Sequence, residues 1–204
     1  MNKLKISVCF IIILTFILLL SSCQKEIKNI PTEEILDDGT VILAENNAVD
    51  FYFYYPENFI IDKNAAMISL YINDSEVVES DIKEPGTGEN IVYLSKPNLS
   101  ATVFDLPAGK YETVDEYWRD LGIPSFEKIF QDIKPEADEN LTINEISAKK
   151  YTFSCSVSDM KYKISNIICI RKHRVYIITY TATENKYETY VNVLNTVAET
   201  FKFK

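Results

Sequence analysis

VYIITY, residues Val175–Tyr180, is a predicted strand that has no polar face. A strand with apolar residues on both sides is covered on both sides by other parts of a fold. Segments 143–157 and 161–171 also have the composition of strands, and Lys172-His173 has the length of a two-residue hairpin turn. We therefore expect VYIITY to lie inside an antiparallel sheet.

Helical patterns flank these strands along the chain. Thr113 and Glu116 match a capping box, in which the threonine accepts from the third helical N–H and the glutamate reaches back. We expect this helix to end at Gly122, a second helical segment at 125–133 and a final amphipathic helix at 184–203. Helices on both sides of a central antiparallel sheet predict an α+β fold of the α-β-α type.

The chain before residue 113 has the pattern of short strands separated by turns. Strands are expected at 40–44, 51–55, 65–72, 91–94 and 99–106. Residues 73–90 are expected to form an acidic loop, and residues 135–140 an acidic turn. Residues 40–204 are long enough to form one domain with a sizeable core.

The first 22 residues have the architecture of a secretory signal peptide. Two lysines precede an apolar run from Ile6 to Leu20, and the small residues Ser21-Ser22 follow. This run is shorter than the roughly 20 residues that a helix needs to cross a bilayer. The next segment, 23–39, is polar and acidic and lacks apolar periodicity, so we expect it to be a flexible tether.

Leu20-Ser21-Ser22-Cys23 resembles the lipobox of bacterial lipoproteins. The resemblance implies cleavage between Ser22 and Cys23, attachment of diacylglycerol to the Cys23 thiol and often a fatty acid such as palmitate on the new amino group. Two or three acyl chains anchor a protein stably, whereas one holds only marginally. We expect a membrane-anchored protein outside the cytoplasm, on the surface of a one-membrane bacterium or in the periplasm or outer membrane of a two-membrane one. An ordinary secretory signal or an uncleaved anchor is the alternative.

The charge balance excludes one class of partner. The chain carries 21 basic and 30 acidic residues, a formal net charge of −9. Residues 1–22 contain two of the basic residues and no acidic one, so the remainder is more acidic still. Nucleic-acid binding needs clustered lysine and arginine, and we expect no nucleic-acid partner.

Two cysteines lie outside the N-terminal segment. Cys155 and Cys169 fall on adjacent predicted strands, about six residues out of register and therefore roughly 20 Å apart. Disulfides join Cα atoms that are at most about 7 Å apart. We expect two buried free thiols without a redox role.

From residue 50 onward the chain resembles PsbP-like (DcrB-like) domains. FYYPENF at 53–59 is similar to their aromatic opening, and the strand at 99–103 followed by the capped helix at 113–117 is similar to the segment that follows. The closing block resembles theirs from 149–151 through 176–180 to Phe201-Lys202-Phe203. The resemblance implies a single α-β-α domain that acts as a docking or assembly module and has no catalytic residues to carry over. Photosynthetic members bind a membrane complex, and many bacterial relatives are lipoproteins.

One basic cluster is a candidate for contact with a partner. Arg171-Lys172-His173-Arg174 contains the chain's only histidine and lies at the predicted hairpin tip. It is either a solvated turn or a contact for an anionic partner. A catalytic triad or a histidine-based metal site would need partners that the sequence does not contain, so we expect no enzymatic activity and no cofactor.

The acidic loop and the tyrosines are weaker candidates. Gly86-Thr87-Gly88 lacks the third glycine and the helix of a phosphate-binding loop. Four carboxylates that lack EF-hand spacing are a weak candidate for a loose surface Ca²⁺ site: Asp74, Glu76, Glu79 and Asp81. Four strand tyrosines either pack in the core or line a ligand cleft: Tyr52, Tyr54, Tyr176 and Tyr180.

Two functions follow as hypotheses. The first is a lipid-anchored, non-enzymatic module that docks onto another envelope protein through the acidic 73–90 segment or the 171–174 tip. The second is a solute-binding lipoprotein with a tyrosine-lined pocket. A real cavity between sheet and helices would favour the second hypothesis over the first.

Overall fold

The computed structural model describes residues 30–37, 39–64, 66–83, 90–157 and 160–204. The chain divides into two units, Met1–Pro31 and Thr32–Lys204, and the fold below is that of the second. The predicted signal peptide and Cys23 lie outside the described residues. Within the described ranges, no helix is long and apolar enough to cross a membrane.

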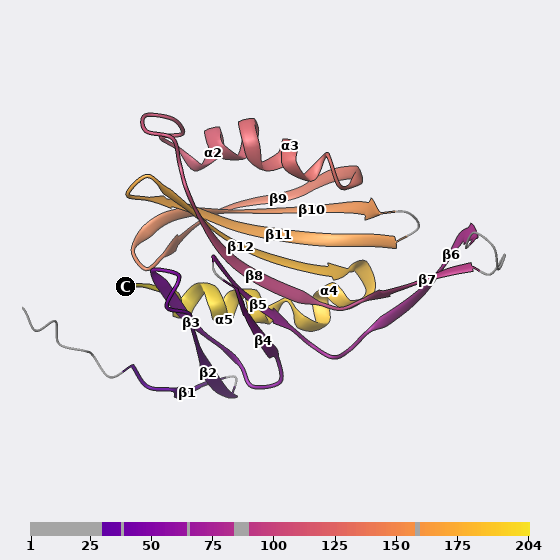
Figure 1. The fold of residues 1–204 in the computed structure, drawn as a ribbon, viewed down its shortest axis with the longest axis horizontal. Helices are drawn as coiled ribbons and strands as arrows, with labels where there is room; N and C mark the ends of the chain where they lie inside the picture. The colour runs from indigo at the N-terminus through magenta and orange to yellow at the C-terminus, as the bar shows by residue number, and fades with distance from the viewer. Residues whose placement is uncertain (1–29, 38, 65, 84–89, 158–159) are drawn as a thin grey trace, which may run out of the picture. The chain divides into compact units, whose positions relative to one another are not determined.

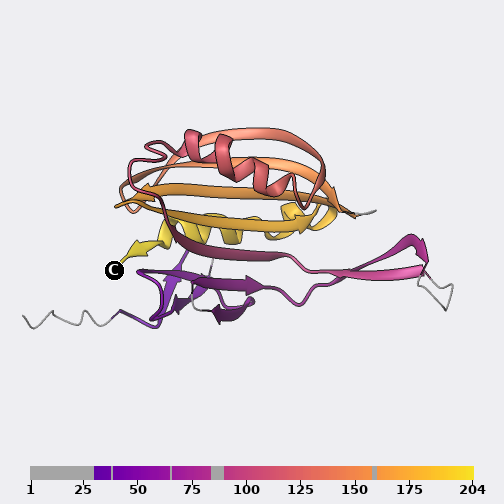
Figure 2. The same ribbon diagram turned by 45° about the horizontal axis from the view of Figure 1, so that its top comes forward.

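Strands make up most of the unit Thr32–Lys204 (Figures 1 and 2). The strands are β1 (Glu33–Leu36), β2 (Gly39–Glu45), β3 (Phe51–Pro56), β4 (Ile60–Asn64), β5 (Met67–Tyr71), β6 (Glu76–Lys83), β7 (Asn90–Ser95), β8 (Asn98–Asp105), β9 (Gln131–Ile143), β10 (Ile146–Val157), β11 (Met160–Arg171), β12 (Arg174–Thr183) and β13 (Lys202–Phe203). The helical segments are α2 (Val114–Tyr117), the π-helical η1 (Trp118–Gly122), α3 (Ile123–Phe126), α4 (Glu184–Tyr190) and α5 (Asn192–Thr200).

Three antiparallel sheets organise these strands. The seven-stranded sheet has the order β4-β5-β8-β12-β11-β10-β9, the four-stranded sheet has the order β1-β2-β3-β13, and β6 pairs with β7 alone. VYIITY belongs to β12, the central strand of the seven, as predicted. Lys172 and His173 have φ angles of 51° and 59° and form the predicted two-residue turn, since positive φ at both positions is typical of a type I′ hairpin.

The two faces of β12 contribute to different hydrophobic clusters. Tyr176, Ile178 and Tyr180 join a large cluster with residues of α4, α5 and β3. Val175 and Ile177 face the other way, toward Tyr117 of α2 and its neighbours. Figure 1 accordingly shows α2 and α3 on one side of the seven-stranded sheet and α4 and α5 on the other.

The central antiparallel sheet is confirmed, but sheets dominate the fold more than an α-β-α sandwich would require. Part of one face is covered by a strand: Phe51 of β3 packs edge-on against Tyr176 with ring centroids 6.2 Å apart. The predicted final helix at 184–203 breaks into α4 and α5 and ends at Thr200. Lys202 and Phe203 then pair with Tyr52 and Phe51, which closes the four-stranded sheet.

The predicted acidic turn at 135–140 is wrong, because these residues form the middle of β9. This strand lies at the edge of the sheet, where proline is tolerated, and Pro135 pairs opposite Phe153. Its carboxylates form ion pairs with lysines of the neighbouring strands: Asp138 with Lys149, Glu139 with Lys150 and Glu136 with Lys163. Charge on an exposed edge strand also discourages pairing with other chains.

The predicted helix end at Gly122 is also wrong. The Thr113 capping box is present, but the helical backbone continues through the π-helical segment η1 into α3. Gly122 is buried because the Trp118 ring lies on it, and a Cβ there would be 2.4 Å from Trp118 Cε3. The second helical segment ends at Phe126, and β9 begins at Gln131.

Two segments expected to be irregular contain strands. Residues 33–36 of the predicted tether form β1, which pairs with β2 through Glu33 opposite Ile42. β6 lies within the predicted acidic loop and pairs with β7, which contains the strand predicted at 91–94. Residues 84–89, which include Gly86-Thr87-Gly88, lie outside the described residues.

Candidate functional site

The turn between β11 and β12 presents the basic cluster. Lys172 and His173 are exposed at its tip, whereas both arginines are half-buried. Arg174 is held by two carboxylates, with Nη1 at 2.8 Å from Asp50 Oδ2 and Nε at 3.0 Å from Asp105 Oδ1. The cluster therefore divides into fixed arginines and an exposed Lys172-His173 pair.

Contacts with the four-stranded sheet hold this turn in place. The Arg171 guanidinium lies over the Phe203 ring, 4.5 Å from its centroid. Tyr176 Oη donates to Asp50 Oδ2 at 2.8 Å, and burial together with this hydrogen bond raises the pKa of Tyr176. These contacts join the turn to β13 and to the residues that precede β3.

Two further lysines belong to the C-terminal segment that contacts the turn through Phe203. Lys202 belongs to β13 and flanks Phe203, the residue beneath Arg171. Lys204 donates through Nζ to the carbonyl oxygens of Asn46 and Val49 at 2.9 and 3.3 Å. We define the basic surface as Arg171, Lys172, His173, Lys202 and Lys204. The sequence pattern did not predict this surface, since the two segments meet in the fold through the contact of Arg171 with Phe203.

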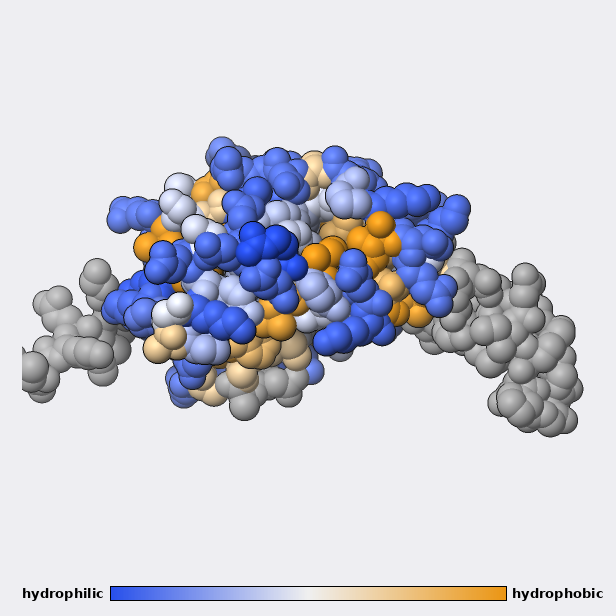
Figure 3. Space-filling view, turned by 90° about the horizontal axis from the view of Figure 1, so that it is seen from above, coloured by the Kyte–Doolittle hydropathy of each residue, from blue (hydrophilic) through white to orange (hydrophobic). Residues whose placement is uncertain are grey.

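Exposed hydrophobic residues are scattered over the described surface. The large ones are Ile35, Ile60, Phe104, Leu121 and Ile129. On the face shown in Figure 3, hydrophobic side chains form small patches separated by hydrophilic ones. Phe104, which is 52% exposed, directly precedes Asp105 and so lies at the same end of the sheet as the basic surface.

Three of the four candidate cleft tyrosines are buried in the core. Tyr176 bonds to Asp50, and Tyr180 Oη donates to the carbonyl oxygen of Tyr187 at 3.1 Å. Burial, together with the nearby Glu34 carboxylate, raises the pKa of Tyr54 to about 12. Tyr52 is half-buried and packs edge-on against Tyr54 with centroids 6.5 Å apart. These tyrosines contact other protein groups, as expected if they pack in the core and do not line a ligand cleft.

A groove of about 550 Å³ lies elsewhere, between α2 and the turn that joins β9 to β10. Carboxylates of Glu112, Asp115 and Glu145 line it together with Lys149. Asp115 accepts from Lys149 Nζ at 2.6 Å and from Tyr151 Oη at 2.7 Å, and these hydrogen bonds lower the pKa of Asp115. The groove is open and polar, unlike the closed apolar pockets that hold most small ligands.

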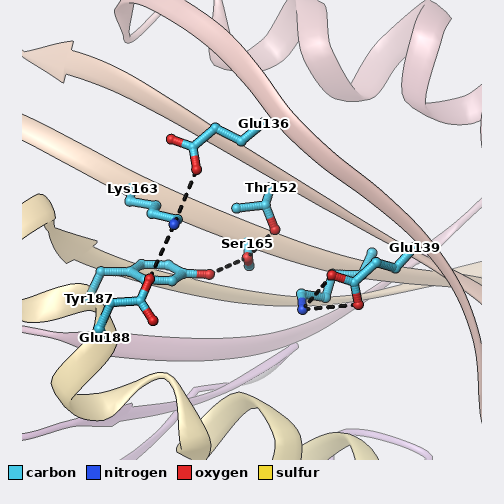
Figure 4. A network of polar contacts seen from close by, with 8 residues as sticks. Glu136, Glu139, Thr152, Lys163, Ser165, Tyr187 and Glu188 are labelled. Atoms are coloured by element: carbon cyan, nitrogen blue, oxygen red, sulfur yellow. Dashed lines mark hydrogen bonds and ion pairs between the residues drawn. The ribbon is translucent and has the colours of Figure 1, made fainter.

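A polar network joins β9, β10, β11 and α4 on one face of the sheet (Figure 4). Its members are Glu136, Thr152, Lys163, Ser165, Tyr187 and Glu188. Lys163 pairs with both glutamates at 3.1 and 3.2 Å and lies 4.6 Å from the Tyr187 ring centroid. The Ser165 hydroxyl is 2.6 Å from the hydroxyls of Thr152 and Tyr187. A serine nucleophile needs a neighbouring base, whereas Ser165 hydrogen-bonds to two other hydroxyls. We therefore interpret the network as structural: its hydrogen bonds join α4 to strands of the sheet.

The two-stranded sheet β6–β7, which we call the arm, projects from the seven-stranded sheet (Figures 1 and 2). Its base is fixed by Asp74, whose Oδ2 accepts from Lys186 Nζ and Tyr190 Oη at 2.7 Å each. These hydrogen bonds lower the pKa of Asp74. Asp74, one of the four candidate ligands of a loose Ca²⁺ site, is thus already hydrogen-bonded to the Lys186 ammonium and the Tyr190 hydroxyl. The side chains of Glu76, Glu79 and Asp81 lie outside the described part of the structure, and no group of possible metal ligands occurs among the described residues.

Both cysteines outside the N-terminal segment are free and buried. Cys155 lies opposite Tyr162 and Cys169 opposite Ala148, close to the predicted register. Burial raises the pKa of Cys155 to about 11 and that of Cys169 to about 12. Two protonated, inaccessible thiols agree with the predicted absence of a disulfide.

Comparison with family models finds no match for this chain, and comparison with curated proteins finds none either. Solved structures with a similar fold include the Ran-binding protein Mog1p of Saccharomyces cerevisiae, at 7% identity and a TM-score of 0.51, over 80% of this chain and 95% of that chain. Others are cyanobacterial PsbP from Synechocystis sp. PCC 6803, at 15% identity and a TM-score of 0.48 over 80% of this chain and 92% of that one, and LpqN, involved in cell envelope biogenesis of Mycobacterium tuberculosis, at 11% identity and a TM-score of 0.49 over 76% and 83%. At these identities the similarity concerns the fold alone.

Proposed function

We propose that the chain is a lipid-anchored protein of the cell envelope whose folded unit binds another envelope protein and catalyses no reaction. The observation that carries the proposal is the arm. Among the described residues, β6 and β7 pair with each other and with no further strand, and they project from the seven-stranded sheet (Figure 2). An isolated two-stranded hairpin is at best marginally stable in water. Contact with a partner would add interactions that stabilise such a hairpin.

The base of the arm is rigidly attached, which suits a docking element. Asp74 bonds the base to Lys186 and Tyr190 of α4. Asn73, just before β6, and Lys96, just after β7, are joined by a hydrogen bond from Lys96 Nζ to Asn73 Oδ1 at 3.0 Å. Lys96 also lies 5.5 Å from the Tyr71 ring centroid. A preorganised element loses less conformational entropy when it binds.

The charge of the arm indicates the chemistry of its partner. β6 carries Glu76, Glu79 and Asp81 against Lys83, within a chain of net charge −9. Complementary charge speeds association and selects among partners more than it raises affinity. The proposed partner is therefore an envelope protein with a basic surface.

In-cell cross-linking tests this proposal. A photo-reactive residue at Val92 on β7 of the anchored protein should join it to one dominant envelope protein. The double variant Glu79→Lys/Asp81→Lys should lose the adduct, because it reverses the charge of β6. Glu127→Lys, an exposed acidic residue after α3, serves as the matched control and should keep the adduct. An adduct that survives the reversal, or a spread of unrelated adducts, contradicts the docking proposal.

Anchoring is tested separately. The Cys23→Ala variant should move from the membrane fraction to the soluble fraction, and the wild-type N-terminal peptide should carry diacylglycerol by mass spectrometry. Retention of the variant in membranes, with an unmodified Cys23 in the wild type, would refute the lipid anchor.

A further inference from the structure

The arm continues two strands of the seven-stranded sheet. β5 and β8 pair as far as Tyr71 opposite Asn98. One further backbone hydrogen bond follows, from the Ile72 N–H to the Pro97 carbonyl oxygen at 3.2 Å. Pairing then resumes between β6 and β7. β6 therefore extends β5, and β7 extends β8, as Figure 1 shows.

The outer neighbours of β5 and β8 do not follow them into the arm. β12 pairs with β8 as far as Thr181 opposite Asn98, after which the chain turns into α4. On the other side, β4 begins at Ile60 opposite Tyr71. Among the strands that the structure describes, none pairs with the outer edge of β6 or of β7. Every second residue along each outer edge therefore directs its N–H and C=O groups away from the hairpin, without a strand partner.

The two outer edges of the arm differ in charge. β6 carries four charged residues in eight: Glu76, Glu79, Asp81 and Lys83. β7 has none, and its run Ile91–Leu94 consists of β-branched, aromatic and leucine residues. Charge on an edge strand protects it from pairing with other chains. The edge of β6 is protected in this way, whereas the edge of β7 is not.

We propose that the arm binds its partner by strand addition: an extended segment of the partner pairs with the outer edge of β7, on the side that β12 occupies along β8. This binding mode rests on the proposed function, whose site it specifies further. Main-chain hydrogen bonds supply the affinity in complexes of this kind. A third strand also supports a two-stranded hairpin that is marginally stable alone.

The composition of the arm defines the chemistry of the added segment. Opposite Ile91–Leu94 the segment carries apolar residues, because apolar cross-strand pairs stabilise a sheet. Lysine or arginine flanks this apolar centre, since charge complementary to the acidic β6 speeds association and selects the partner. A second copy of this chain fits less well, because it carries the same formal net charge of −9.

Proline substitution tests whether the backbone of β7 makes the contact. Neighbouring residues of a strand direct their N–H groups to opposite edges, so two adjacent prolines remove one N–H that pairs within the arm and one that faces outward. Tyr93→Pro and Leu94→Pro form such a pair on β7. Directly opposite them on β6 lie Val78 and Val77, and Val78→Pro and Val77→Pro form the matched pair. Tyr93→Ala and Leu94→Ala keep the N–H and control for loss of the side chain.

The readout is the yield of the in-cell photo-adduct from position 92 of the full-length anchored protein. Both β7 prolines should lower this yield at least about fivefold relative to alanine at the same position, since one breaks the arm and the other breaks the added strand. One of the two β6 prolines should keep the adduct, because its N–H faces the edge that the partner does not use.

Each other result has a distinct meaning. A β7 proline that keeps the adduct, or alanine variants that lose it as fully as the prolines, would overturn strand addition while leaving the docking proposal intact. Loss of the adduct with both β6 prolines would overturn the assignment to β7, and an adduct between two copies of this chain would overturn the choice of partner. A wild-type chain that forms no adduct refutes the proposed function itself.

Discussion

Replacing Gly122 with alanine should destabilise the protein, although alanine is the better helix former. Alanine in a helix interior gains about 1 kcal/mol over glycine. Its Cβ, however, would lie 2.4 Å from Trp118 Cε3. The indole has little room to move, because it stacks on Tyr151 with centroids 4.5 Å apart and touches Phe126 and Phe153. Overpacking costs about 1–3 kcal/mol, and a contact this short against a ring packed among three others belongs to the upper part of that range, about 2–3 kcal/mol. After the gain in helix propensity, the net loss should be about 1–2 kcal/mol.

Urea unfolding followed by tryptophan fluorescence measures this effect directly, since Trp118 is the only tryptophan. Thermal melting should show Tm lowered by about 2–8 °C for a domain of this size. In a Trp118→Leu background the same glycine substitution should become neutral or stabilising, because the ring that it meets is gone; circular dichroism follows that pair. A Gly122→Ala protein as stable as the wild type, with an unchanged near-ultraviolet spectrum, would refute this account of η1.

Other features give predictions of comparable sharpness. Hydrogen bonding from Lys149 lowers the pKa of Asp115 in the folded state. The stability that the Asp115 carboxylate contributes is therefore present above its unfolded pKa of about 3.9 and is lost as pH falls through the lower folded value. In the Asp115→Asn variant, the midpoint of urea unfolding should depend less on pH below about 4 than in the wild type. Phe201→Ala should cost about 3–5 kcal/mol in urea unfolding, since the ring is 1% exposed in the main core, and a loss below about 1 kcal/mol would contradict this. Cys155 and Cys169 should react with a thiol reagent only after denaturant is added, and rapid labelling of the native protein would count against their burial.

Local signals predicted the parts of this fold that local chemistry decides. The Thr113 capping box and the Lys172-His173 turn depend on residues within a few positions of each other, and both are present. The apolar run of β12 correctly placed it in the centre of an antiparallel sheet. The cap and the turn could be predicted because the energy that stabilises them comes from neighbouring residues, and β12 could be predicted because its lack of a polar face requires cover on both sides.

Long-range contacts account for the failures. Pro135 and the carboxylates around it have the pattern of a turn, yet they suit an edge strand once lysines of β10 and β11 face them. Gly122 has the pattern of a helix end, yet it is small because an indole four residues earlier folds back over it. The basic surface was half predicted: 171–174 is visible in the sequence, whereas Lys202 and Lys204 join it through the contact of Arg171 with Phe203.

The closure of the four-stranded sheet has a consequence for how the chain matures. Tyr54 and Thr200, 146 residues apart, exchange hydrogen bonds through the threonine hydroxyl, and Phe201 then stacks on Phe51. At synthesis rates of about 5–20 residues per second, the early aromatic strand waits about 7–30 s for these partners. During that interval the nascent polypeptide cannot complete its core, and contacts of such high sequence separation also form slowly. A chain that is still unfolded when its synthesis nears completion can pass through a narrow translocation pore. The same delay exposes the unfolded chain to aggregation before the four-stranded sheet closes.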